Sequence, residues 1–181
     1  MVAVGYRRPD ELDRDDNVFD VIQVILTGPN GWLAQSLTQD PGVALAVRAA
    51  ATFPGGRYPS QFAIVAQPAP GRTIDQVVSA VQAVIDRLRA QPVDEATLTR
   101  ARAHVRESIL AALMQNSGAA ALLAAGAAEY GDWLEPLNEM ARLEKISAAD
   151  VQKVAAKYLV PEHRTVAFSG SETAPAAEGG K

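Results

Sequence analysis

Residues 24–47, with the sequence VILTGPNGWLAQSLTQDPGVALAV, predict four structural elements in succession. A helix ends at Gly28 and Pro29, because proline cannot continue a helix. A short amphipathic helix follows over residues 32–39, then a turn, and an apolar strand begins at Val43. We look for function first in this stretch, since the patterns elsewhere in the chain are those of a scaffold.

The strand that begins at Val43 has a period of two, which is typical of a half-buried strand. The pattern predicts two faces, namely Val43, Leu45, Val47, Ala49, Ala51 and Phe53 on one and Ala44, Ala46, Arg48, Ala50 and Thr52 on the other. We expect helices to pack closely against the second face, because its side chains are small. A loop with Gly55 leads into a returning strand over residues 61–66, so these strands are predicted to be antiparallel neighbours.

The rest of the chain adds a strand near each end and a run of helices. Strands are predicted over residues 2–7 and 165–168. This order is neither a βαβ alternation nor a helical bundle. It predicts an α+β fold, with a mostly antiparallel sheet and helices packed on one face. Residues 1–168 are expected to form one domain, and residues 169–181, rich in Gly, Ser, Ala, Pro and Glu, a flexible tail.

The composition excludes several classes of function. The net charge is −4 and the 17 Lys and Arg residues are scattered, which argues against a nucleic-acid surface. The chain has no cysteine, so disulfides, thiol catalysis and cysteine metal sites are excluded. No signal peptide is evident, and the cytoplasm and the bacterial periplasm or cell envelope both stay open.

Residues 109–128 are the only long apolar stretch, and polar residues 115–117 interrupt it. A membrane span needs about 20 apolar residues without such a break. We therefore expect no membrane span, but two buried helices that meet at a kink. Further along, capping boxes are predicted at two helix starts, Asp132 with Glu135 and Ser147 with Asp150.

His104 and Glu107 are the most tempting candidates for chemistry, because a His and a Glu three residues apart share one side of a helix. Zinc needs at least three protein ligands, however, and the only other histidine, His163, precedes a strand. We interpret the pair as a solvated helix flank. The aspartates of residues 10–16 are likewise expected to be a helix cap and a solvated face. With no serine elbow, P-loop or dinucleotide pattern, we predict no catalytic residue and no metal site in this chain.

Several local phrases resemble the insulinase/pitrilysin family of zinc peptidases, which includes the mitochondrial processing peptidases. They are VAVGYRRP at residues 2–9, VFDVIQVILTG at 18–28, GDW at 131–133 and, most specifically, KISAADVQKVAAKYL at 145–159. The match is to the second, non-catalytic domain of these proteins. The resemblance implies a LuxS/processing-peptidase-like metallohydrolase fold.

In that family two similar domains pair like the halves of a clamshell, and the first carries a His-x-x-Glu-His zinc motif that this chain lacks. The resemblance therefore implies no cofactor in this chain and zinc in a catalytic partner domain or subunit. The second domain often supplies an Arg and a Tyr that reach the substrate. Thr38 and Leu45 stand at those positions, and neither side chain can do that work.

Two functional hypotheses follow from the resemblance. In the first, the chain closes the chamber and helps to hold extended peptide substrate through Thr38, Val43, Leu45, Val47 and Ala49, the strand edge pairing with the peptide. In the second, it is a degenerate structural or assembly domain that binds a partner protein without touching substrate. Neither predicts activity of the chain alone, and a homo-oligomer stays open.

Overall fold

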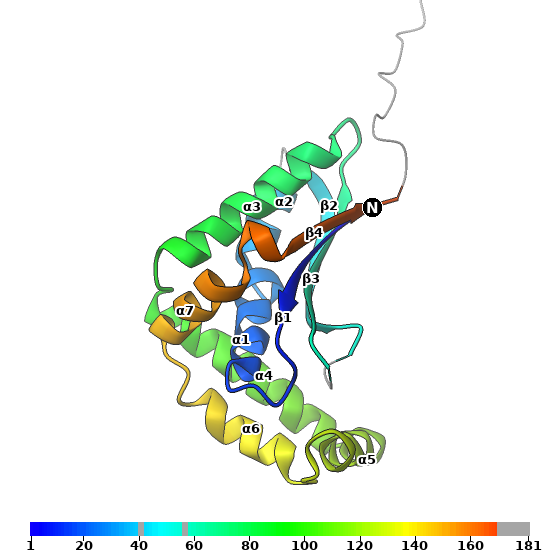
Figure 1. Ribbon diagram of the computed structural model, residues 1–181, viewed down its shortest axis with the longest axis vertical. Helices are drawn as coiled ribbons and strands as arrows, with labels where there is room; N and C mark the ends of the chain where they lie inside the picture. The colour runs from blue at the N-terminus through cyan, green and yellow to red at the C-terminus, as the bar shows by residue number, and fades with distance from the viewer. Residues whose placement is uncertain (40–41, 56–57, 170–181) are drawn as a thin grey trace, which may run out of the picture.

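The computed structural model describes residues 1–39, 42–55 and 58–169, and it has the predicted α+β fold. A four-stranded antiparallel sheet carries helices on one face, while its other face is bare (Figure 1). The strands are β1 (Val2–Arg8), β2 (Ala44–Phe53), β3 (Ser60–Pro68) and β4 (Arg164–Phe168), in the order β2-β3-β1-β4. Both β2 and β4 are therefore edge strands. The predicted tail lies outside the described residues, apart from Ser169.

The helical layer is built from segments far apart in the sequence. The helices are α1 (Asp16–Thr27), α2 (Trp32–Thr38), α3 (Ile74–Ala90), α4 (Glu95–Leu113), α5 (Asn116–Ala125), α6 (Glu135–Leu143) and α7 (Ala148–Tyr158), with a π-helical turn η1 (Gly126–Tyr130) and a 3₁₀ turn η2 (Pro161–His163). The helices α1, α2, α3 and α7 contact the sheet, whereas α5 and α6 lie at the far end of α4 (Figure 1).

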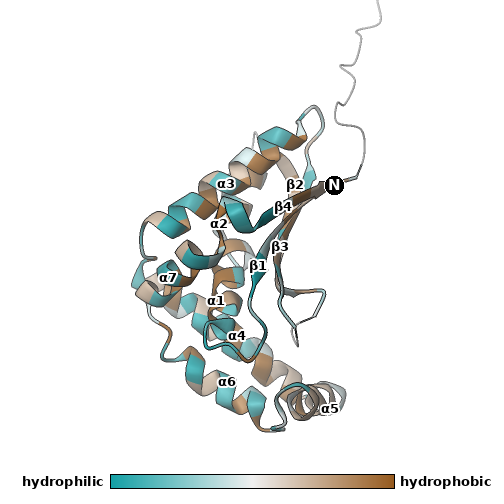
Figure 2. Cartoon of the chain, viewed as in Figure 1, coloured by the Kyte–Doolittle hydropathy of each residue, from teal (hydrophilic) through white to brown (hydrophobic). Residues whose placement is uncertain are grey.

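The core lies between the sheet and these helices, where each amphipathic helix buries one stripe. Brown and teal bands alternate along α3 and α6, as this arrangement requires (Figure 2). Tyr6, Phe19 and Phe62 are fully buried at its centre. The Phe19 ring centroid lies 6.0 Å from that of Phe62 and 5.5 Å from that of Tyr158, distances that suit tilted aromatic packing. Phe19 thereby joins helix α1 to strand β3 and to helix α7.

The turn between α1 and α2 has the predicted chemistry. Gly28 donates its N–H to the carbonyl of Val24 over 2.8 Å and ends α1. Asn30 has a φ of 60°, in the left-handed region that asparagine tolerates. A Cβ on Gly31 would lie 2.5 Å from the Leu26 carbonyl oxygen, so only glycine fits this close approach. The turn then leads into α2, which packs against β2.

Strand β2 departs from the predicted alternation, because two irregularities shift its phase. One lies between Ala44 and Ala46, and it leaves Leu45 57% exposed instead of in line with Val47. The other lies between Ala50 and Phe53, and Phe53 is 56% exposed. The prediction of one continuous Val43–Phe53 face was therefore wrong. A pattern with a strict period of two does not show where a strand contains an extra residue.

The expectation that helices cover the small-residue face of β2 was also wrong. Arg48 and Ala50 line a hollow of about 430 Å³ on the bare face, together with Ala3, Gly5, Ala63 and Ala167 from the other strands. Helices cover the opposite face, which carries Ala44, Val47 and Ala51. The small side chains of β2 thus line a shallow hollow on the sheet surface and do not make a close contact with a helix.

The long apolar stretch forms two helices that meet at a kink, but the second is not buried as expected. Helix α5 has no buried residue, and Met114 before it is 87% exposed. No single helix in the described ranges is long and apolar enough to cross a membrane; α4 and α5–η1 qualify only as a pair bent by 111°. Of the predicted capping boxes, Ser147 with Asp150 is confirmed, whereas α6 starts at Glu135 without a side-chain cap.

Candidate functional site

The two positions where the resemblance expects an Arg and a Tyr lie at the surface beside β2. Thr38 ends α2, and its hydroxyl donates to the Ala34 carbonyl over 2.6 Å. Leu45 lies at the first irregularity of β2 and is exposed. Val43, Val47 and Ala49 are instead half-buried and pack on the core. Of the five predicted substrate residues, only Thr38 and Leu45 are well exposed to solvent, and their role stays a prediction.

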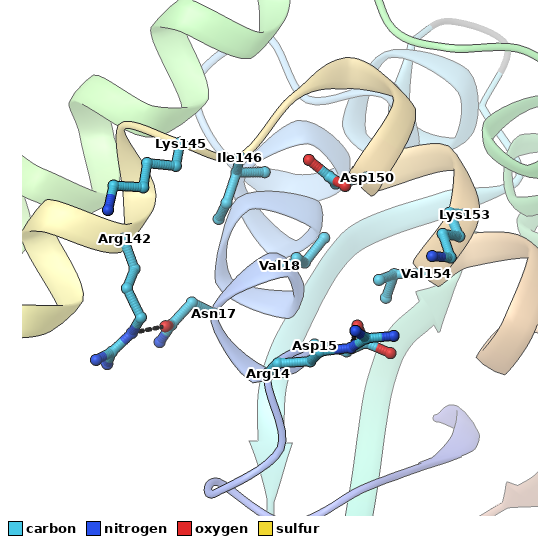
Figure 3. A pocket seen from close by; sticks show the side chains of 10 residues that line it. All are labelled: Arg14, Asp15, Asn17, Val18, Arg142, Lys145, Ile146, Asp150, Lys153 and Val154. Atoms are coloured by element: carbon cyan, nitrogen blue, oxygen red, sulfur yellow. Dashed lines mark hydrogen bonds and ion pairs between the residues drawn. The ribbon is translucent and has the colours of Figure 1, made fainter.

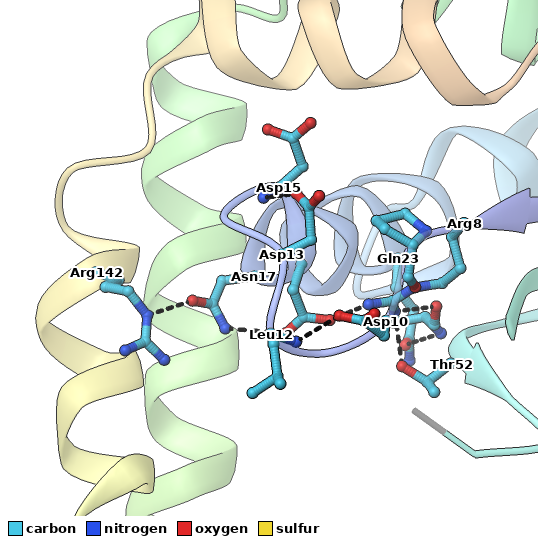
Figure 4. Close-up of polar contacts among 12 residues, drawn as sticks. Arg8, Asp10, Leu12, Asp13, Asp15, Asn17, Gln23, Thr52 and Arg142 are labelled. Carbon is cyan, nitrogen blue, oxygen red and sulfur yellow. Dashed lines mark hydrogen bonds and ion pairs between the residues drawn. The ribbon is translucent and has the colours of Figure 1, made fainter. Parts of the chain in front are cut away.

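The outer edge of β2 is partly closed by side chains from α1 and β1. Gln23 accepts the N–H of Ala51 at 2.8 Å, and Thr27 accepts the N–H of Ala49 at 3.3 Å. Arg8 donates to the Ala51 carbonyl and to the Thr52 hydroxyl, both at 2.6 Å (Figure 4). An added strand would need the same backbone groups. The open part of this edge is therefore the stretch around Leu45–Val47.

Arg8 is the centre of this closure. It is 3% exposed, forms an ion pair with the buried carboxylate of Asp16, and its guanidinium lies 4.6 Å from the ring centroid of Phe19. Burial lowers the pKa of Arg8, and the nearby carboxylates of Asp20 and Glu11 oppose that shift. The expectation that Asp16 belongs to a solvated face was wrong, because this carboxylate balances a buried cation.

Sequence reasoning missed Arg8, Gln23 and Thr27, although one signal was present. Arg8 continues the alternation of Val2, Val4 and Tyr6, all of which face the core. A charged residue on the buried side of a strand indicates a buried partner. Gln23 and Thr27 are four residues apart on α1, so they share one side of that helix.

Carboxyl groups with altered protonation lie close to this closure. Burial raises the pKa of Asp20 to about 6, and Arg8 opposes that rise. Burial also raises the pKa of Glu11 to about 7, with Glu129 nearby, and the pKa of Glu139 to about 7, with Asp20 nearby. These groups keep their protons to a higher pH than exposed carboxyls do. They mark the α1–α6 side as sensitive to pH.

The clearest hollow beside α1 has mixed charge and no catalytic arrangement. It measures about 290 Å³ and is lined mainly by residues of α1, α6 and α7 (Figure 3). Arg142 donates to the Asn17 amide oxygen over 2.5 Å, and Lys157 donates to Asp15 over 2.8 Å. Asp150 accepts from the Ser147 cap. Most of its charged groups therefore already have partners within the fold.

His104 and Glu107 lie on the outer side of α4, where they line a second hollow with Thr97, Arg100 and Asn30. In the ranges that the structure describes, no three His, Asp or Glu side chains are grouped as metal ligands would be. The pair thus offers two candidate ligands where zinc needs three. No nucleophile with a neighbouring base appears beside them.

Comparison with known proteins gives this geometry a context. A family model described as the peptidase M16 inactive domain matches residues 1–105. The inactive peptidase domain of a candidate zinc protease from Bordetella parapertussis has a TM-score of 0.83 and 24% identity, over 98% of this chain and 94% of that one. A protease from Helicobacter pylori has a TM-score of 0.83 and 19% identity, and there the chain spans 40% of the longer protein. No curated protein sequence matches.

The fold is that of an α+β domain, and its described side chains include no recognisable catalytic set. The chain belongs to the peptidase M16 family, and the part that it matches is the inactive domain. The family resemblance expected from the sequence is thereby confirmed. The periplasmic protease PqqL from Escherichia coli contains the same fold with a TM-score of 0.68, and this chain covers 18% of it.

Proposed function

We propose that this chain is the non-catalytic half of a zinc metallopeptidase, which closes the chamber and helps to hold extended peptide for a zinc-bearing catalytic domain or subunit. The family match to an inactive domain carries the proposal. Zinc belongs to the partner in this proposal. The substrate contact is assigned to the open stretch around Leu45–Val47, with Thr38 beside it.

An exposed apolar surface around α5 supports the need for a partner. Met114, Trp133 and Leu137 are 87%, 58% and 44% exposed, and α5 itself has no buried residue. Monomeric proteins rarely expose large apolar patches, and such patches often mark sites of contact with other proteins. We assign this α5 surface to the contact with the catalytic half.

A second candidate function is an assembly domain that binds the partner without touching substrate. The closed part of the β2 edge favours it, because Gln23, Thr27 and Arg8 occupy groups that a peptide would use. The absent Arg and Tyr favour it as well, since Thr38 and Leu45 offer no charge to a developing oxyanion.

The test mixes the chain with a zinc-bearing half, a protein or domain with a His-x-x-Glu-His motif from the same genome. Cleavage of a fluorogenic peptide is expected only in the mixture. The N–H groups of Ala49 and Ala51 point away from β3, so by the alternation of the ladder the N–H of Val47 does too. Val47→Pro should therefore reduce cleavage strongly, because it removes a donor that an added peptide strand would use. Complex formation without any cleavage favours the assembly role. Peptidase activity with stoichiometric zinc in the pure chain overturns both.

A further inference from the structure

Among the described residues, the opposite edge of the sheet, β4, is open from Val166 to Phe168. Met1 and Ser169 exchange two backbone hydrogen bonds of 2.9 Å each. Hydrogen-bonded pairs alternate in an antiparallel ladder, so Ala167 and Thr165 also bond to β1, whereas Val166 and Phe168 point their N–H and C=O groups outward. Within the described residues no hydrogen bond reaches these outward groups, and no element passes in front of β4 in Figure 1.

Apolar side chains beside this edge are also partly exposed. Val166 is 38% exposed and Phe168 50% exposed. They line a hollow of about 280 Å³ with Ile74 and Val78 of α3. Helix α3 packs mainly over β1 and β3, and it approaches β4 through the residues that line this hollow and through Gln82, which accepts from the Arg164 guanidinium over 2.5 Å. A further strand beside β4 would bury apolar side chains as well as satisfy backbone groups.

We infer that β4 pairs with β4 of a second copy of this chain, antiparallel and centred on Val166. In this register Val166 of each copy exchanges both backbone bonds with its counterpart. Phe168 of each copy donates its N–H to the Arg164 carbonyl of the other. The N–H of Arg164 is already bonded to Pro161 and needs no partner. The two sheets become one eight-stranded sheet about a two-fold axis.

The charges suit a second copy in this register. Arg164 of one copy lies opposite Phe168 of the other, not opposite another arginine. Arg164 donates to Gln82 of its own α3 over 2.5 Å and lines the same hollow as Phe168 and Asp75. In the proposed register each Arg164 also approaches the Asp75 carboxylate of the other copy. No ion pair to Asp75 is recorded in the described part of the chain. The attraction of the cation is to the Asp75 carboxylate, whereas the positive end of the α3 dipole opposes it.

The helical layers leave room for this arrangement. Two β4 strands between the two β1 strands place those strands roughly 14 Å apart, at about 4.8 Å per strand. Packed helices need only about 8–10 Å between their axes, so two α3 helices over β1 do not collide. The gap between them is the space into which Val166 and Phe168 of both copies project.

The partial closure of the β2 edge favours a dimer over a longer array of copies. If both edges were open, pairing could continue from copy to copy and form a fibre. Gln23, Thr27 and Arg8 already satisfy outward groups of β2. In the described residues β4 is the edge with most of its outward backbone groups unpaired. When two β4 strands pair, neither remains an open edge, and the result is a closed, isologous dimer.

The test is sedimentation equilibrium of the full 181-residue chain with hydrogen exchange of the Val166 and Phe168 amides. The expected result is a dimer whose two amides gain protection as concentration rises. Val166→Pro removes only an outward N–H and should weaken the dimer on the order of tenfold or more. Val47→Pro makes the same change at the β2 edge and should leave it intact. Phe168→Lys serves as a second dimer-breaking variant if the proline variant does not fold.

Three results would overturn the inference. The first is a monomer at every concentration tested. The second is a folded Val166→Pro protein that dimerises as tightly as the wild type, which would place the contact elsewhere, for example on the α5 surface. The third is concentration-independent protection of Val166 that is lost when the chain ends at Ser169, which would make the chain's own last residues the occupant.

Discussion

The two edge strands of the sheet differ in whether their outward backbone groups are hydrogen-bonded. At β2, two amide hydrogens and one carbonyl of the backbone are bonded to Gln23, Thr27 and Arg8 of the same chain. At β4, the outward groups of Val166 and Phe168 have no such partners among the described residues. An edge strand is a ready template for association, so the difference decides where an added strand can bind. It also restricts the substrate hypothesis for β2 to the stretch around Leu45–Val47.

The closure of β2 depends on a buried charge, whereas β4 is held by its pairing with β1 and by the hydrogen bond from Arg164 to Gln82 of α3. Arg8 contacts the aromatic core, the Asp16 carboxylate and the β2 backbone at once. A buried cation of this kind costs free energy to desolvate, and it costs more when its partner is removed. Variants of the β2 side should therefore affect stability more than variants of β4, and this expectation orders the predictions below.

The largest effect is expected for Arg8→Ala. The substitution leaves the Asp16 carboxylate buried without its cation and removes the donor to Ala51 and Thr52. We expect a loss of about 3–5 kcal/mol in the free energy of unfolding, measured by urea denaturation. The double variant Arg8→Met with Asp16→Asn removes both charges and should recover a large part of that loss. A loss below about 1 kcal/mol for Arg8→Ala would show that the pair is not a buried anchor.

A smaller effect is expected for Gln23→Ala, which reopens the edge of β2 without removing a charge. The N–H of Ala51 loses its acceptor, and the free energy of unfolding should fall by about 1–2 kcal/mol. Hydrogen exchange of the Ala51 amide should become faster, as already expected for Val166 in the monomer. Gln67→Ala, at an exposed position of the mostly buried β3, is the matched control, with a change within about 0.5 kcal/mol. Unchanged protection of Ala51 would mean that another group closes the edge.

Much of the fold could be predicted from the sequence because local signals carried it. The turn at residues 28–31, the Ser147 capping box and the antiparallel pairing of β2 with β3 all follow from residue chemistry within a few positions. The phase of β2 could not be predicted. An irregularity depends on the partner strand, and no period in one strand reveals it.

The candidate site was less accessible to sequence reasoning. The pattern assigned Val43, Leu45 and Val47 to one face, yet only Leu45 of the three is well exposed. The closure by Arg8 and Gln23 joins residues 43 and 28 positions away from Ala51. Contacts over such separations are set by the tertiary fold. Only the buried position of Arg8 in the alternation of β1 could have suggested them.

The stability of the fold should also depend on pH, because carboxyl groups with raised pKa values lie on the α1 side, near the closed part of the β2 edge. Asp20 keeps its proton to a pKa of about 6 and Glu139 to about 7, whereas unfolded carboxyls release theirs near pH 4. The folded state binds more protons between these values, so stability falls as the pH rises through them. We expect a thermal midpoint a few degrees lower at about pH 8 than at about pH 5.5.

Glu139→Gln is the variant that checks this cause. It removes one of the carboxyls whose ionisation is opposed by burial, and the midpoint should vary less between the two pH values. Glu107→Gln, on the outer side of α4, is the control and should leave the pH dependence unchanged. A midpoint that instead rises with pH over this range would contradict the assignment.

The smallest effect on stability is expected where the β2 edge is open, for Thr38→Arg combined with Leu45→Tyr. Both side chains are exposed, so the free energy of unfolding should change by no more than about 0.5 kcal/mol. In the mixture with a zinc-bearing half, the new cation and hydroxyl should raise kcat, since they can donate to a developing oxyanion. Ser36→Arg, also exposed on α2, is the matched control and should not. A destabilisation above about 1 kcal/mol would mean that these side chains are enclosed, and the substrate role of this stretch would then lose its structural basis.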